Sequence, residues 1–346
     1  MGIQLELEEG TLKAKIDIQT VMERLADMER QPSLSVLHGL SDLSRDDFLR
    51  FQSAWGDLPV ARRRWVIHIL VQQAEERVEL HYTPLLCWLM GDPDAQVRAQ
   101  AIEGLWEDED AGLLKPLMRL LHEDADEMVR AAAASAMGRF VVLGELGEID
   151  ASIAMGCEKA LLATIHTPEE SVEVRRRAVE AIAYSSESGV RDLIRNAYYD
   201  EDERMRISAV FAMGRSADRH WRNSVLTELQ STLPAMRFEA VRACGELELS
   251  DAVLDVGALT EDDDAEVRQA AIWALGRIGG NEARRILLEY ADSADDAVST
   301  AADAALDELS FGEDALQFPV YDLDGDDGDD EDKTDPDVWG ALDDDR

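Results

Sequence analysis

The stretch DDDAEVRQAAIWALGRIGG, residues 262–280, recurs in looser form along the chain. Two earlier copies, DEDERMRISAVFAMGRSAD (200–218) and DADEMVRAAAASAMGRFVV (124–142), keep the same order of acidic, apolar and small residues. A pattern that returns at a fixed period is the signature of a repeat architecture. The copies share one Arg, which either carries chemistry or supports the structure.

One Arg that follows Val or Met marks each copy. The steps between markers are 31 or 32 residues, except for one of 45 that contains the insertion VVLGELGEIDASIAMG. A further step of 31 reaches Ser299, where the frame continues without the Arg. The markers are Arg98, Arg130, Arg175, Arg206, Arg237 and Arg268.

Each copy predicts a capped helix. Small and apolar residues follow the marker at helical spacing, and we expect Gly138, Gly214 and Gly276 to end their helices. Leu233, followed by Pro234, departs from the N-cap pattern. In the other copies an Asp or Ser four residues before the marker is the expected N-cap: Asp94, Asp126, Ser171, Asp202, Asp264 and Asp295.

Between the markers lies a second helical pattern, such as NEARRILLEYA at 281–291. Two short antiparallel helices per repeat, neither able to bury its apolar face alone, make an α-solenoid. The sequence therefore predicts an all-α fold, an α-solenoid of about seven helical hairpins.

The pattern D-x-D-x-x-V-R-x-x-A-x-x-A-L-G resembles the HEAT repeat, in the short form also found in phycobilisome-lyase-type HEAT-like repeat proteins. The resemblance covers about 80–310 and, more weakly, 40–80, where Arg63 stands near the marker position. It implies that each marker Arg and the acid six residues before it form a buried ladder between adjacent repeats. Ser231 breaks the series of acids, which are Asp92, Asp124, Glu169, Asp200 and Asp262. One Arg per repeat at a constant helical phase suits a structural role, so we expect all six markers to be structural.

The ends of the chain differ from the array. We expect residues 1–15 to be a leader or a small hairpin, 16–78 an N-terminal helical cap with a divergent repeat, and 79–310 the HEAT-like array. From Glu313 the last 34 residues hold 15 Asp and Glu against two basic residues, a net −13. Such a segment cannot bury enough apolar surface to fold, so 311–346 is predicted to be an acidic disordered tail. Its clusters around Phe318, Tyr321 and Trp339 leave open a docking motif or a solubilising tail.

The charge balance excludes some partners. The 346 residues include 74 acidic and 34 basic side chains, a formal charge of −40, which argues against binding nucleic acid or an anionic membrane. It suits a basic partner for the protein or its tail; adaptation to the host is the open alternative. There is no signal-peptide pattern or 18-residue apolar run, and the three Cys stand in apolar helical contexts. We therefore expect a cytoplasmic protein.

Three kinds of catalytic or metal chemistry fit the sequence poorly. The stretch DLDGDDGDDEDK (322–333) has Asp327 and Lys333 where an EF-hand loop needs Gly and Glu. Deoxyhypusine hydroxylases are HEAT enzymes with His-Glu pairs in several helices, but here only His122-Glu123 forms such a pair. No cluster marks the attachment of a bilin. We predict no catalytic, cofactor or metal-binding residue.

A surface remains as the candidate site. If the Val before the marker faces the core, the residues one and five places after the marker point away from it. Upstream these places hold Arg176 and Glu180, then Ala131 and Ser135; they become aromatic only downstream. Exposed aromatic and Arg side chains favour protein binding, so the predicted partner-binding residues are Ile207, Phe211, Phe238, Arg242, Gln269 and Trp273.

The expected function is a non-enzymatic scaffold or adaptor that binds another protein on the concave face of the solenoid. The alternative is an enzyme or enzyme accessory of the HEAT type, similar to a bilin lyase or a metal-dependent hydroxylase.

Overall fold

The computed structural model describes residues 16–293 and 295–315, and within these ranges all regular secondary structure is helical. Seven successive hairpins, α5/α6 to α17/α18, form the repeat array, and α1–α4 precede it. The fold is the predicted α-solenoid. The expected hairpin or leader at 1–15 lies outside the described residues. The predicted disordered tail was placed from 311 onward, but α18 continues through 311–315; the rest of the tail, with its calcium-like stretch, lies outside the described residues.

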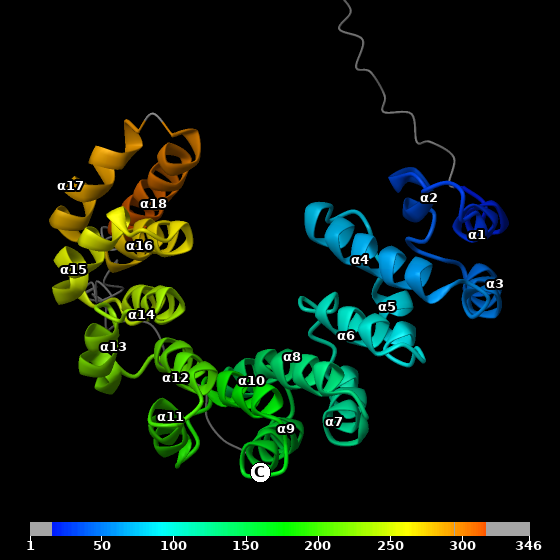
Figure 1. The fold of residues 1–346 in the computed structure, drawn as a ribbon, viewed down its shortest axis with the longest axis horizontal. Coiled ribbons are helices and arrows are strands. Elements are labelled where there is room, and N and C mark those ends of the chain that lie inside the picture. The colour runs from blue at the N-terminus through cyan, green and yellow to red at the C-terminus, as the bar shows by residue number, and fades with distance from the viewer. Residues whose placement is uncertain (1–15, 294, 316–346) are drawn as a thin grey trace, which may run out of the picture.

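The helices form two rows along a curve (Figure 1). The inner row begins at α4 and continues through the second helix of every hairpin, each packed on the next. Its members are α4 (Val60–Glu76), α6 (Ala95–Glu103), α8 (Glu127–Glu145), α10 (Val172–Ile182), α12 (Glu203–Arg215), α14 (Pro234–Glu246), α16 (Ala265–Ile278) and α18 (Asp296–Ala315).

The first helices of the hairpins form the outer row, and the N-terminal helices close one end of the array (Figure 1). The outer helices are α5 (Thr83–Leu89), α7 (Leu114–Glu123), α9 (Ala151–Ile165), α11 (Val190–Tyr198), α13 (Arg222–Glu228), α15 (Val253–Ala258) and α17 (Gly280–Ala291). The N-terminal helices besides α4 are α1 (Ile18–Ala26), α2 (Leu34–His38) and α3 (Arg45–Trp55). Helix α9 lies in the 45-residue interval between the markers Arg130 and Arg175. The insertion therefore lengthens one hairpin and leaves the curve unbroken.

The predicted N-caps are in place. The side chain of each predicted N-cap accepts a hydrogen bond from a backbone N–H in the first turn of its helix: Asp94, Asp126, Ser171, Asp202, Asp264 and Asp295. Leu233 caps α14 without a side-chain bond, and Pro234 is the first helical residue. Pro fits there because the first N–H of a helix has no intrahelical partner.

Three glycines predicted to end helices lie inside them instead. Gly138 is in the middle of α8, and Gly214 and Gly276 lie within the last turns of α12 and α16. A Cβ at Gly276 would come within 3.0 Å of the Ala305 Cα in α18, and one at Gly214 within 2.9 Å of the Ala243 Cα in α14. The repeated glycine therefore lets neighbouring inner helices pack closely.

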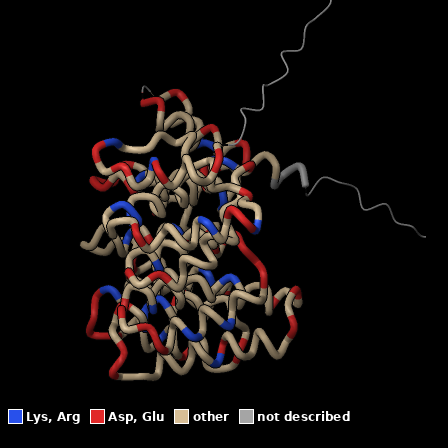
Figure 2. Tube along the Cα trace, turned by 90° about the vertical axis from the view of Figure 1, so that its right-hand side faces the viewer, with Lys and Arg blue, Asp and Glu red and all other residues tan. Residues whose placement is uncertain are grey.

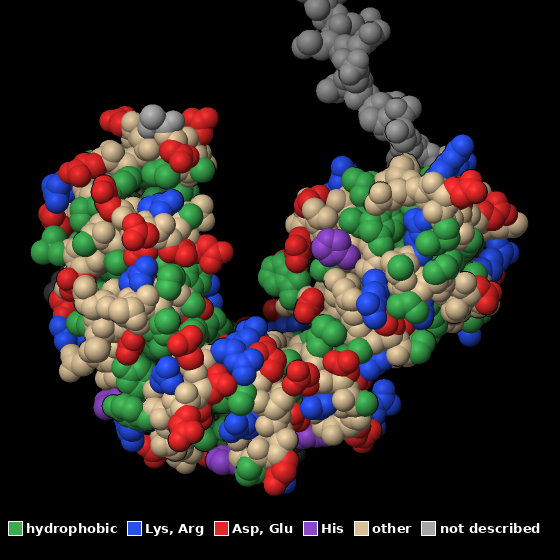
Figure 3. Space-filling model, viewed as in Figure 1, with side chains coloured by type: hydrophobic (Ala, Val, Ile, Leu, Met, Phe, Trp, Pro, Cys, Tyr) green, Lys and Arg blue, Asp and Glu red, His purple; other side chains and the backbone are tan. Residues whose placement is uncertain are grey.

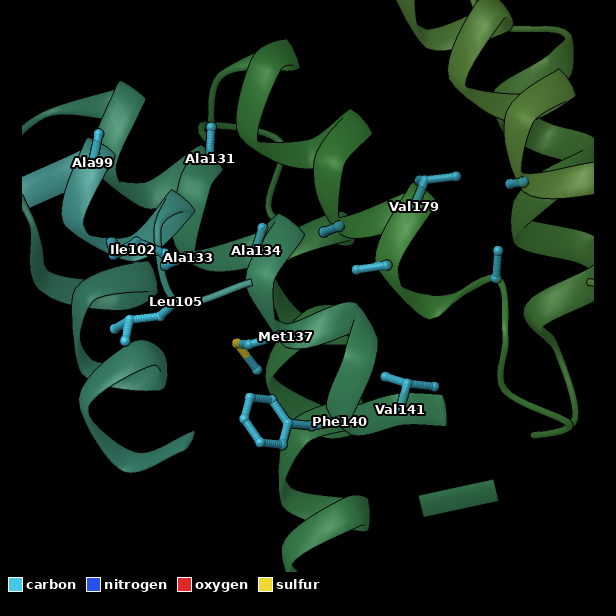
Figure 4. Packing of buried hydrophobic residues seen from close by; sticks show 14 of the residues in the cluster. Ala99, Ile102, Leu105, Ala131, Ala133, Ala134, Met137, Phe140, Val141 and Val179 are labelled. Atoms are coloured by element: carbon cyan, nitrogen blue, oxygen red, sulfur yellow. The ribbon is translucent and has the colours of Figure 1, made fainter. Parts of the chain in front are cut away.

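The core runs along the solenoid between the two rows. Around α8, the buried side chains of Ile102, Met137 and Phe140 fill the space between helices, and Ala133 and Ala134 bring the backbones together (Figure 4). This mix of large and small residues suits thin layers of paired helices. No helix in the described ranges is long and apolar enough to cross a membrane.

Two marker arginines join adjacent repeats in the same way. Arg98 donates from Nε and Nη2 to the two carboxylate oxygens of Asp124, at 2.8 and 2.7 Å, and from Nη1 to the main-chain carbonyl of Asp92 at 2.8 Å. Arg237 binds Asp262 at 2.7 Å through both nitrogens and the carbonyl of Ser231 at 2.9 Å. The residue six places before each Arg, Asp92 or Ser231, thus contributes its main-chain carbonyl, and the carboxylate comes from the following repeat.

The ladder differs from the prediction at two further places. Arg130 pairs with Glu170 at 2.9 and 2.8 Å, not with the predicted Glu169. The 45-residue step lies between the two repeats that this pair joins. The ladder also begins earlier than the six markers. Arg63 donates to both oxygens of Asp92 at 2.8 Å, and both side chains are buried.

The other three markers make no such pair among the described side chains. Arg206 and Arg268 bind only main-chain carbonyls of the loop before their own helix, because Ser231 and Ser293 stand where the next acid would be. The Nε of Arg175 is buried without a hydrogen-bond partner. The six-membered ladder is therefore incomplete.

Candidate functional site on the concave face

The inner helices bring part of the predicted binding surface together. The guanidinium of Arg242 lies 5.9 Å from the ring centre of Phe238 and 5.5 Å from that of Trp273, so it bridges α14 and α16. Arg215 lies 5.2 Å from the ring of Phe211 on α12. We call Phe211, Phe238, Trp273 and these two arginines the aromatic ridge. Its rings are half-buried and its cations lie over them, an arrangement that holds the rings in place.

The other two predicted binding residues, Ile207 and Gln269, lie beside the aromatic ridge and are not part of it. Ile207 packs partly against the core beside the ridge, and Gln269 is exposed at its edge. The open space between the two arms of the curve leaves this side of the inner row accessible (Figure 3).

A hollow of about 490 Å³ lies upstream of the ridge, between α6, α8 and α10, and the sequence reasoning missed it. We call it the central hollow. Ala131 and Ser135 of α8 are the equivalents of Ile207 and Phe211 of α12, one and five residues after the marker. Because they are small, the concave surface is recessed there. Trp106, in the turn after α6, forms one wall, and Met128 of α8 is also part of the lining. Small residues at these two solvent-facing positions were the sequence signal that could have predicted the hollow.

A second hollow, of about 700 Å³, joins the central hollow to the ridge. Both are lined by Ser135, Arg139 and Arg177, and the second also by Ile207 and Phe211. The central hollow, the second hollow and the ridge thus form one continuous concave surface from α6 to α16.

The most perturbed acid on this surface is Glu239 of α14, which lines the second hollow. Its Oε2 is buried without a hydrogen-bond partner. Burial raises the pKa of Glu239 to about 7, with the nearby carboxylates of Glu180 and Glu246 adding to the effect and Arg242 opposing it. Glu239 is therefore a carboxyl that gains or loses its proton near neutral pH.

The arginines that line the two hollows differ in their hydrogen-bond and ion-pair partners. Arg176 and Arg177 both bind Glu173 and Glu180, at distances from 2.6 to 3.3 Å, and form a neutral cluster. Arg139 makes one long bond, 3.4 Å from Nη1 to the carbonyl of Trp106, while its Nε and Nη2 are buried without an acceptor. Burial lowers the pKa of Arg139.

The described residues contain no metal-ligand cluster, and two of the three cysteines are buried. Within 16–293 and 295–315 there is no group of three or more His, Cys, Asp or Glu side chains placed to hold a metal ion. Cys157 and Cys244 are buried, and burial raises the pKa of both thiols to about 12, far from the depressed values of reactive cysteines.

The repeats can now be placed among known proteins. Residues 83–152 and 222–307 match the family model of HEAT repeats. The chain carries HEAT repeats. The matched ranges run from α5 through α8 to the start of α9 and from α13 into α18, whereas α10 and α12 of the inner row lie between them.

Solved structures with a similar fold are distant in sequence. The complex of CpcE and CpcF of phycocyanin lyase from Nostoc sp. PCC7120 is 14% identical, with 83% of this chain and 97% of that chain covered and a TM-score of 0.49. Escherichia coli YibA is 17% identical, with 81% and 98% covered and a TM-score of 0.44. Human deoxyhypusine hydroxylase is 18% identical, with 85% and 96% covered and a TM-score of 0.33. No curated protein matches the sequence.

Proposed function

We propose that the chain is a non-enzymatic, cytoplasmic scaffold or adaptor that binds another protein on its concave face. The observation that carries the proposal is the continuous surface of aromatic ridge and hollows along the inner row. Solenoids use such concave surfaces for extended partners. Half-exposed aromatic and Arg side chains are also the residues in which binding energy concentrates.

Affinity capture from host lysate tests this proposal. The bait is the whole chain, compared with the ridge variant Phe211→Ala/Phe238→Ala/Trp273→Ala and with a chain that ends at Ala315, which keeps α18 intact. The matched control replaces three exposed apolar residues of the outer side, as Tyr199→Ala/Leu254→Ala/Leu288→Ala.

We expect a specific protein to be retained by the whole chain and the outer variant and lost by the ridge variant. A folded ridge variant that keeps every partner contradicts the proposal. Loss of the partner only on truncation at Ala315 would assign recognition to the acidic tail.

An enzyme or enzyme accessory of the HEAT type is the second candidate, and Glu239 is the observation that favours it. A carboxyl with a pKa near 7 in a hollow that charged side chains also line has the properties of a general base. Incubation with host metabolite extract, followed by mass spectrometry, tests it. A compound consumed by the whole chain and spared by Glu239→Gln would establish catalysis.

A further inference from the structure

We propose that the central hollow binds a basic side chain, arginine above all, from a basic segment of the protein partner. This inference rests on the proposed function and names the chemistry of the partner at one place on the concave surface. Three features of the hollow carry it: an exposed indole side chain in its wall, carboxylates without partners, and the charge around them.

The first feature is the shape and chemistry of the walls. Trp106 is 56% exposed and Met128 is 44% exposed, although both line the same hollow. Ala131, Ala132 and Ala136 are also part of the lining and leave room for a long side chain. The aliphatic stem of an arginine can lie on such a surface, while its planar head stacks on an indole ring.

The second feature is a pair of free carboxylates at the rim. Glu103 and Glu127 line the hollow and make no hydrogen bond or ion pair with any described side chain. Glu173, the third acid of the lining, is already bound to Arg176 and Arg177. Two carboxylates beside an exposed indole suit the fork-shaped donors of a guanidinium.

The state of Glu103 supports this assignment. Partial burial raises its pKa, and Arg177 opposes the shift only in part. A cation bound at the rim would favour the ionised form of Glu103, so binding should lower its pKa.

The third feature is the balance of charge. Arg177 is neutralised by Glu173 and Glu180, which leaves Arg139 as the single unpaired cation of the lining, against Glu103 and Glu127. Arg139 itself lies in the field of Asp108 and Glu109. Acidic residues outnumber basic ones in the full sequence, 74 to 34, and they are spread over the coloured part of the trace (Figure 2). This field attracts a basic segment and repels an acidic one such as the tail of net −13.

Fluorescence anisotropy with the full chain tests the inference. The probes are two short fluorescein-labelled peptides of Gly, Ala and Leu, identical except for arginine or citrulline at the centre. Citrulline keeps the shape of arginine and removes the charge. A third probe carries the sequence of residues 334–346 from the acidic tail.

We expect the arginine peptide to bind about tenfold more tightly than the citrulline peptide, and to weaken as salt rises from about 50 to 300 mM. Glu103→Gln and Trp106→Ala should each remove most of this preference. The matched controls are Glu123→Gln at the end of the outer helix α7 and Tyr199→Ala beyond α11, both exposed, and both should keep it.

Equal binding of the arginine and citrulline peptides overturns the inference, as does tighter binding of the tail peptide. Unchanged binding by folded Glu103→Gln and Trp106→Ala variants does so too. Failure here is distinguishable from failure of the scaffold proposal, because a lysate partner lost only by the ridge variant would leave that proposal standing while the peptides show no preference.

Discussion

At the scale of single residues, the pKa values of buried carboxyl groups shift in opposite directions along this array. The Asp124 carboxylate receives two hydrogen bonds from Arg98, whereas Glu239 has a buried oxygen without a donor. Burial disfavours the ionised form of both, but only Asp124 has the bonds that offset it. The pKa is therefore lowered at Asp124 and raised at Glu239.

The first prediction concerns the stability contributed by Glu239. Its folded pKa of about 7 lies above the ordinary value of 4.5, so the unfolded chain holds the ionised form more readily. The resulting destabilisation is absent below about pH 4.5, grows as the pH rises to 7 and is constant above. We expect Glu239→Gln to gain on the order of 2 kcal/mol of unfolding free energy at pH 8 relative to its effect at pH 4.5.

Urea unfolding of both chains at the two pH values measures this difference. Glu289→Gln, on the exposed side of α17, is the matched control and should show almost no pH-dependent gain. The same small gain at both pH values for Glu239→Gln would mean that Glu239 is solvated and ionised in the folded protein.

At the scale of helices, close packing between inner neighbours sets the role of the repeated glycine. Ala at Gly276 raises helix propensity by about 1 kcal/mol, but its Cβ would lie 2.9 Å from the Ala305 Cβ and carbonyl oxygen. A contact so close to backbone atoms forces α16 and α18 apart, at a cost of roughly 1–3 kcal/mol.

The second prediction follows from that balance. We expect Gly276→Ala to lower the unfolding free energy by about 1 kcal/mol or more, as the clash outweighs the gain in propensity. Gly156→Ala is the matched control, since α9 leaves open space around Gly156, and should stabilise by about 0.5–1 kcal/mol. Chemical denaturation of both variants gives the two signs, and a stabilising Gly276→Ala would show that the inner row can relax.

At the scale of the whole molecule, the curve is held by ion pairs that recur between repeats. Burial would raise the pKa of Asp124 and Glu170, but the bonds from Arg98 and Arg130 offset it, so both values are lowered. The bonds from Arg237 lower the pKa of Asp262. All three pairs link one hairpin to the next, so their loss weakens the interfaces that a solenoid depends on.

The third prediction is acid unfolding through these pairs. A carboxyl with a depressed folded pKa contributes stability that is complete above its unfolded pKa and is lost as pH falls through the folded value. We expect thermal stability to fall steeply below about pH 4. Asp262→Asn should lose stability at pH 7 by about 1–3 kcal/mol and show a shallower acid decline. Circular dichroism melts across pH check both, and an identical acid profile for the variant would remove Asp262 from the cause.

Much of the fold was predictable because its determinants are local. Helical phase, N-cap side chains and the 31-residue period lie within single repeats, so Asp94 or Asp264 can be recognised without knowing the partner helix. The ladder was only partly predictable, since Arg130 binds Glu170 across the insertion. The site was predictable where outward residues are large and was missed at Ala131 and Ser135, because a hollow is defined by its surroundings.

The sequence by itself determined that the chain is an α-solenoid of HEAT-like hairpins, since periodicity and capping act over a few turns of helix. Tertiary structure decided which atoms meet. Only the packing of α16 on α18 shows that Gly276 is a contact and not a helix end. Only the placing of the turn after α6 beside α8 makes Trp106 a wall of the central hollow. Such pairings depend on distances between helices, which the residues of one repeat do not specify.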